Sequence, residues 1–190
     1  MTTESELPKR AGGWSAIRHR LAASPPEKLI ALLKDLHDAS PENRDFLRAR
    51  FEGEGEQGAA LEDCRRKIVE QFFPQRGFGR AKLAEARKVI RAYSKATGNV
   101  AGTIELLLTY VENGTKYTCE YGDIDGPFYN GMESAAAEME KLVRREGRAC
   151  YRPLRERIFQ VAAAADQIGW GYGDSMGDWA ARMDEALGAE

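Results

Sequence analysis

Apolar residues recur along this chain at helical spacing, in segments that proline, glycine and capping residues separate. The sequence Ser24-Pro25-Pro26-Glu27 is typical of a helix start, with Ser24 as the expected capping residue. Ser40-Pro41 repeats this pattern and predicts a second, shorter helix that ends before Gly53. Because the joint between them is tight, we expect the two helices to form an antiparallel hairpin. The apolar side of the first helix consists of Leu29, Leu32, Leu33 and Leu36.

The same spacing predicts further helices over the rest of the chain. Gly98 and Gly147 are expected to end two of them. Asn99 begins the most apolar helix, which we expect to be central and to end at Asn113-Gly114. Only residues 115–121 have the composition of a short extended segment. The sequence therefore predicts an all-α fold of about eight helices in successive antiparallel hairpins, as an irregular helical bundle or a short α-solenoid. The hairpins are expected to start near residues 25, 59, 99 and 150.

The length and composition are those of one ordinary globular domain. The chain has 190 residues, of which 43% are hydrophobic and 31% charged. We expect residues 1–13 to form a disordered tail and residues 14–190 a single helical domain. No apolar run approaches the roughly 20 residues of a membrane span, and the acidic start is unlike a secretory signal. Three widely spaced cysteines favour reduced thiols, and we expect a cytoplasmic protein.

Residues 110–129, YVENGTKYTCEYGDIDGPFY, combine tyrosines with carboxylates where the helical pattern breaks. A second aromatic cluster, GWGYGD at residues 169–174, interrupts a later helix. We expect a binding site, if the chain has one, to lie in an aromatic-lined cleft between these two segments. The commoner arrangement, which we favour, is that Trp170 and Tyr172 fill the core where the helix breaks. The candidate ligand-binding residues are Tyr110, Glu112, Tyr117, Glu120, Tyr121, Asp123, Asp125, Tyr129, Trp170, Tyr172 and Asp174.

The carboxylates of the first segment suggest two kinds of site. Glu120, Asp123 and Asp125 could hold a magnesium or calcium ion, although their spacing does not fit the calcium loop of an EF-hand. We favour the simpler interpretation that the two aspartates cap turns and a helix starting at Pro127. Paired carboxylates such as Glu112 and Glu120 can act as general acid and base, but no catalytic or phosphate-binding motif accompanies them. We therefore assign no catalytic residue, cofactor or metal ligand, and favour a role other than catalysis.

Basic residues gather within residues 141–157, where they could contact the phosphates of a nucleic acid. Acidic residues interleave with them, and the net charge of −2 gives no overall attraction to polyanions. We therefore favour a solvated surface of salt bridges over a nucleic-acid interface. The basic residues are Lys141, Arg144, Arg145, Arg148, Arg152, Arg155 and Arg157.

Three segments carry a resemblance to a known family. They are LLKDLHDASPENRDFLRARF, TYVENGTKYTCEYGDIDGPFYN and IGWGYGD, which together extend over most of the chain from about residue 29 to residue 174. The chain resembles an uncharacterised family of small all-helical bacterial proteins, a domain of unknown function. The resemblance implies a bacterial, soluble, all-helical protein, and it implies no role for any residue.

The function expected from the sequence is protein binding or assembly, because stacked helical hairpins present extended surfaces. The first alternative is a small-molecule or metal-binding enzyme with its site between the 110–129 segment and the 169–174 turn. The second alternative is nucleic-acid binding through the basic residues of 141–157. We expect a protein partner and no membrane association, and the sequence leaves the oligomeric state open.

Overall fold

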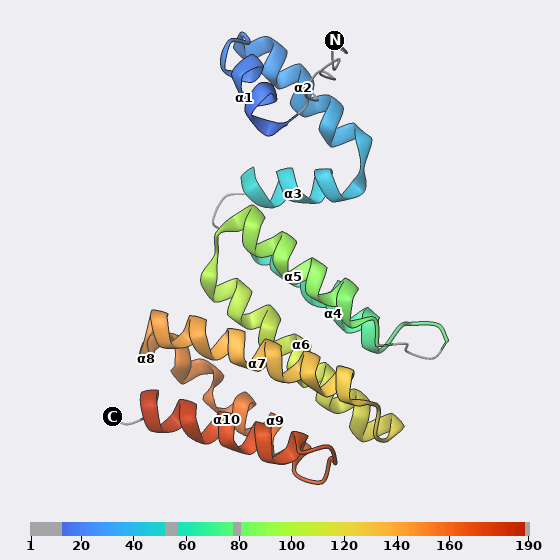
Figure 1. Ribbon diagram of the computed structural model, residues 1–190, viewed down its shortest axis with the longest axis vertical. Helices are drawn as coiled ribbons and strands as arrows, with labels where there is room; N and C mark the ends of the chain where they lie inside the picture. Colours follow the sequence, from blue (N-terminus) through green and yellow to red (C-terminus); the bar gives the residue numbers. More distant parts are fainter. Residues whose placement is uncertain (1–12, 52–56, 78–80, 189–190) are drawn as a thin grey trace, which may run out of the picture. The chain divides into compact units, whose positions relative to one another are not determined.

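The computed structural model describes residues 13–51, 57–77 and 81–188, and these residues form ten α-helices and one 3₁₀ turn, with no strand among them (Figure 1). The predicted all-α fold is confirmed. All of the expected disordered tail except Gly13 lies outside the described residues. Where we expected one domain over residues 14–190, the chain divides into two compact units, unit 1 (residues 1–47) and unit 2 (residues 48–190). Each unit is described by itself.

Unit 1 contains α1 (Trp14–Ala22), α2 (Pro26–Ala39) and most of α3 (Pro41–Phe51). Its helix starts follow the predicted pattern only in part. The Ser40 hydroxyl accepts a hydrogen bond from the Asn43 N–H at 3.1 Å, which caps α3 as expected. The expected capping by Ser24 is wrong, because its hydroxyl donates back to the Arg20 carbonyl at 2.9 Å and Pro25 is the N-cap residue of α2.

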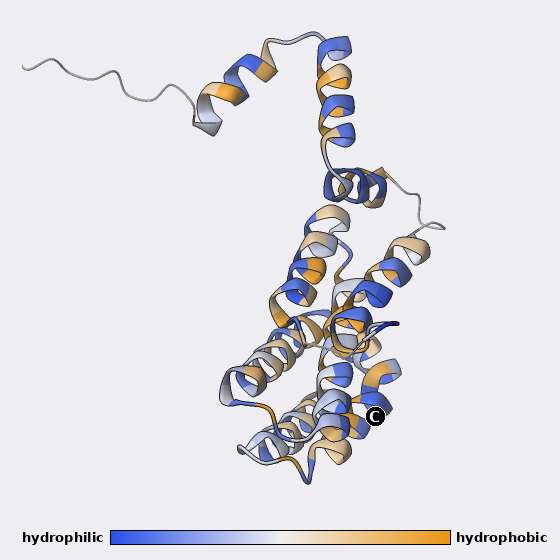
Figure 2. Cartoon of the chain, turned by 90° about the vertical axis from the view of Figure 1, so that its right-hand side faces the viewer, coloured by the Kyte–Doolittle hydropathy of each residue, from blue (hydrophilic) through white to orange (hydrophobic). Residues whose placement is uncertain are grey.

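The predicted hairpin of α2 and α3 does not form. The Asn43 side-chain amide donates to the Leu36 carbonyl at 2.7 Å and fixes the turn at Ser40, but the two helices do not pack along each other. None of the described residues of α1, α2 and α3 is buried. Both the hydrophobic and the hydrophilic residues of α2 therefore lie at its surface (Figure 2). Its apolar side, here called the leucine face, consists of Leu29, Leu32, Leu33 and Leu36.

Unit 2 consists of three antiparallel hairpins that follow one another along the chain, α4–α5, α6–α7 and α9–α10 (Figure 1). These are the hairpins predicted to start near residues 59, 99 and 150. Helix α6 is central, because it packs against α4, α5, α7 and α9. Its Leu107 and Leu108 are fully buried. The bounds are α4 (Gln57–Phe72), α5 (Leu83–Thr97), α6 (Val100–Tyr121), α7 (Gly126–Glu146), α8 (Arg148–Tyr151), η1 (Arg152–Leu154), α9 (Arg155–Ala165) and α10 (Tyr172–Leu187).

Helix α6 is two turns longer than its sequence suggested. We predicted an end at Asn113-Gly114 followed by an extended segment, but residues 115–121 continue the helix. Gly114 is buried where α7 crosses, and a Cβ on it would overlap Met132 Sδ. The glycine therefore permits close helix packing and is not a helix end. The true end is Gly122, at a φ of 87°.

The end of α5 and the start of α6 are as predicted. Gly98 ends α5 at a φ of 65°, a left-handed conformation that favours glycine. The Asn99 side chain then accepts a hydrogen bond from the Gly102 N–H at 2.9 Å and caps α6. No helix in the described ranges combines the length and the apolar character that crossing a membrane requires.

Candidate functional site

The two segments predicted to form a site lie side by side in unit 2. The connection between α6 and α7 approaches the turn between α9 and α10. A Cβ placed on Gly169 would lie 2.9 Å from Asp123 Oδ2, and a Cβ on Gly126 would lie 3.8 Å from Trp170 Cζ3. The structure therefore brings together residues about 45 positions apart in the sequence, and the direction of their side chains decides what they can bind.

Tyr129 and Tyr172, two of the three buried tyrosines in the candidate set, pack against each other in the core. Their ring centroids are 5.0 Å apart. The Thr115 hydroxyl donates to the Val111 carbonyl at 2.9 Å, so at its 2.7 Å contact with Tyr172 it accepts the phenol proton. Burial raises the pKa of Tyr172 well above its ordinary range. These hydroxyls are thus satisfied by the protein itself, which is the arrangement of aromatic residues that fill a core.

The two aspartates of the connection hold its backbone and side chains in place. Asp125 caps α7, since its Oδ1 accepts a hydrogen bond from the Phe128 N–H at 2.9 Å. Asp123 Oδ1 accepts a hydrogen bond from the Tyr129 hydroxyl at 3.1 Å. Within the described ranges no three histidine, cysteine, aspartate or glutamate side chains gather as metal ligands would.

The remaining aromatic candidates divide between core and surface. Tyr110 is fully buried, its ring 5.5 Å edge-on from Phe72, and its hydroxyl has no hydrogen-bond partner among the described residues. Half-buried Tyr117 packs against exposed Tyr121 at 4.8 Å. Trp170 is 65% exposed and has a φ of 62°, unusual for a residue with a side chain. Glu120 and Asp174 are exposed.

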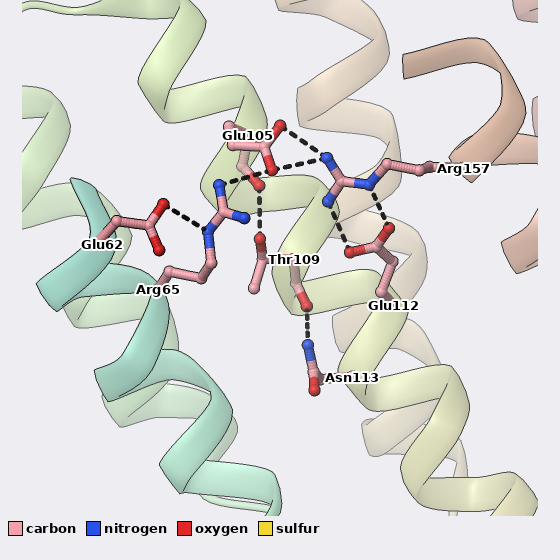
Figure 3. A network of polar contacts seen from close by, with 7 residues as sticks. All are labelled: Glu62, Arg65, Glu105, Thr109, Glu112, Asn113 and Arg157. Carbon is pink, nitrogen blue, oxygen red and sulfur yellow. Dashed lines mark hydrogen bonds and ion pairs between the residues drawn. The ribbon is translucent and has the colours of Figure 1, made fainter. Parts of the chain in front are cut away.

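Glu112, the other candidate, belongs to a charged cluster that sequence reasoning missed (Figure 3). The Arg157 guanidinium on α9 binds the Glu112 carboxylate through two bonds, Nε to Oε1 at 2.7 Å and Nη2 to Oε2 at 2.8 Å. Its Nη1 reaches both oxygens of Glu105 at 2.7 and 2.8 Å. Arg65 Nη2 on α4 contacts the same Glu105 at 3.0 Å. The cluster therefore connects α4, α6 and α9.

The carboxylates of this cluster are not available as a general acid or base. The Arg157, Glu105 and Glu112 side chains are only 31%, 17% and 28% exposed. The hydrogen bonds to Glu112 raise the pKa of Arg157, so the guanidinium stays charged at every accessible pH. Each carboxylate already has a guanidinium partner, so neither serves as a free acid or base. Glu105 and Glu112 are seven positions apart on α6, and that spacing, with Arg157 opposite, is the signal that could have revealed the cluster.

The basic residues of 141–157 are largely paired. Arg144 contacts Glu140 at 2.8 Å, and Arg145 contacts Glu146 at 3.0 Å. Arg155 binds Asp184 through two bonds, which lower the pKa of Asp184. Arg157 is occupied in the cluster described above. The cations without an ion pair to any described residue are Lys141, Arg148 and Arg152.

Several large apolar side chains are exposed together on α2 in unit 1. Leu32, Leu33 and Leu36 are 42%, 44% and 47% exposed, and Ile30 beside them is 67% exposed. On α1, Trp14 is exposed as well. Apolar side chains gathered on one exposed helix face are typical of an interaction surface. The sequence indicated this face correctly, but we had assigned it to the buried side of a hairpin.

No protein-family model, curated protein or solved structure matches this chain. The resemblance to an uncharacterised helical family therefore stays a prediction. The function has to be inferred from the surfaces that the helices present.

Proposed function

We propose that this chain is a protein-binding or assembly domain and that the leucine face of α2 is its binding surface. The observation that supports the proposal most is the exposure of that face in a unit whose described helices contain no buried residue. Unit 2, by contrast, has a buried apolar core of its own.

The energetics favour an occupied leucine face. A helix of 14 residues such as α2 is marginal when it stands alone in water, because helix nucleation is costly. Burying a leucine side chain fully contributes about 1.5–3 kcal/mol relative to leaving it exposed. The four leucines have the i, i+3, i+4, i+7 spacing by which an amphipathic helix docks on an apolar partner surface.

We place this role in the cytoplasm. No disulfide joins Cys64, Cys119 and Cys150 in unit 2. Free thiols are the usual state of cysteine in a reducing compartment, where structural disulfides are rare.

The proposal is tested by site-specific photo-crosslinking in living cells. A photoreactive amino acid at position 33, on the leucine face, should form crosslinks to another polypeptide chain. The same group at position 34, on the opposite side of α2, is the matched control and should crosslink far less. Mass spectrometry then identifies the crosslinked peptide. Crosslinks from position 33 that reach only residues 48–190 of the same chain would contradict the proposal, because the face would then be covered from within.

A further inference from the structure

We propose that the leucine face binds the same face of a second copy of this chain, with the two α2 helices antiparallel. This inference rests on the proposed function and names its partner. The charges that border the leucine face, and their symmetry, favour this partner.

One border of the leucine face carries two charges of opposite sign, Lys28 and Asp35. At about 100° per residue, positions seven apart return to within about 20° of the same direction, so both lie on the same border. They are separated by about 10.5 Å along the axis, too far to pair with each other. Both are exposed, and neither forms an ion pair with a described residue.

On the opposite side of α2, Lys34 and Asp38 are already paired, whereas Glu27 forms no ion pair with a described residue. Lys34 Nζ contacts Asp38 Oδ2 at 2.7 Å, and that bond is the main reason why the pKa of Asp38 falls to about 2. Lys28 and Asp35 are thus the two charges that border the apolar surface and form no ion pair with a described residue. Charged residues at this position, beside the apolar seam, select partner and orientation when helices pair.

An antiparallel pair with a two-fold axis brings leucine against leucine and lysine against aspartate at the same time. The midpoint of Lys28 and Asp35 and the midpoint of Leu29 and Leu36 differ by one residue, about 1.5 Å along the helix, and both lie next to Leu32. An antiparallel pair crossing there places Leu29 opposite Leu36 of the second copy. It also places each Lys28 beside Asp35 of the other chain, twice by symmetry.

A parallel pair would lose this match. In parallel pairing the border with Lys28 and Asp35 faces the other border of the second helix, which carries Ile30 and His37. Neither side chain offers a charge partner to both Lys28 and Asp35. The charges therefore favour the antiparallel orientation. Because α2 is only 14 residues long, about 21 Å, the interface is small and the dimer is expected to be concentration-dependent.

The test is a charge-reversal series on the full chain, followed by sedimentation velocity over a range of concentrations. Lys28→Asp places two aspartates together across the interface, and Asp35→Lys places two lysines together. Each single variant is expected to dimerise at least tenfold more weakly than the wild type. An equimolar mixture of the two variants should recover the wild-type dimer, because both contacts become attractive again in the mixed pair.

Matched controls separate the interface from the stability of the helix. Lys34→Asp combined with Asp38→Lys reverses the paired charges on the far side and should leave dimerisation unchanged. Leu32→Asp should abolish dimerisation in any combination. Circular dichroism of each variant checks that its helical content is that of the wild type.

Three outcomes would overturn the inference: a wild-type chain that stays monomeric at every concentration, a mixture that fails to recover the dimer, or a dimer that survives Leu32→Asp. If the chain is monomeric while position 33 crosslinks to a different protein, the proposed function holds and the second copy is ruled out as the partner. If position 33 crosslinks only within its own chain, both proposals fall.

Discussion

Replacing Arg157 by methionine should destabilise unit 2 by about 2–3 kcal/mol. The substitution keeps most of the side-chain volume but removes the guanidinium that binds both Glu105 and Glu112 on one side of α6. Breaking a fully buried ion pair costs about 3–5 kcal/mol, and breaking an exposed one at most about 1. These side chains are less than one third exposed, and Glu105 keeps its 3.0 Å contact with Arg65, so an intermediate loss is expected.

Urea unfolding followed by circular dichroism measures this loss. The matched control is Arg155→Met on the same helix, whose partner Asp184 is reached from a side chain that is 52% exposed, and its effect should be much smaller. Adding Glu105→Gln and Glu112→Gln to Arg157→Met should recover part of the stability, since the uncompensated charges are removed. A loss below about 0.5 kcal/mol for Arg157→Met, or no recovery in the triple variant, would refute the reasoning.

Two further predictions concern the core of unit 2. Leu107→Ala should lower the free energy of unfolding by about 2–5 kcal/mol in the same urea assay, because it leaves a cavity beside the central helix. Leu33→Ala on the leucine face is the control and should change it by less than about 0.5 kcal/mol. Equal effects of the two substitutions would contradict the assignment of core and surface. Burial raises the pKa of Tyr110 to about 12 from an ordinary value near 10, so the folded state holds this proton more tightly. The free energy of unfolding should therefore be unchanged below about pH 10 and fall as the pH rises towards 12. Absorbance at 295 nm should show that Tyr110 and Tyr172 ionise together with unfolding. Ionisation of both tyrosines at pH 10 in the folded protein would be inconsistent with their burial.

The sequence was a good guide at several positions where local rules decide the structure, although not at Ser24. The end of α5 at Gly98 and the start of α6 at Asn99 were both predicted correctly, because each depends on residues within a few positions. Gly114 misled us for a tertiary reason. Its role is to let α7 approach α6, and nothing near it in the sequence identifies Met132 as the neighbour.

The candidate site was harder to predict, since it depends on which side chains point inward. Aromatic and acidic residues at 110–129 and 169–174 do meet, but Tyr129 and Tyr172 turn towards the core while Trp170 faces solvent. The Arg157 cluster was missed because we assigned the arginine to a basic surface. The leucine face was visible in the sequence, and only the three-dimensional structure distinguishes an exposed apolar side from a buried one.

The three tryptophans give this chain built-in fluorescent reporters of its separate parts. Trp179 in α10 is 1% exposed, whereas Trp14 in α1 and Trp170 in the turn before α10 are 68% and 65% exposed. Acrylamide should therefore quench two of the three and leave a blue-shifted emission from Trp179. Single-tryptophan variants would then follow α1, the α9–α10 turn and the core of unit 2 independently. Binding of a partner to unit 1 could thus be observed separately from any change in unit 2.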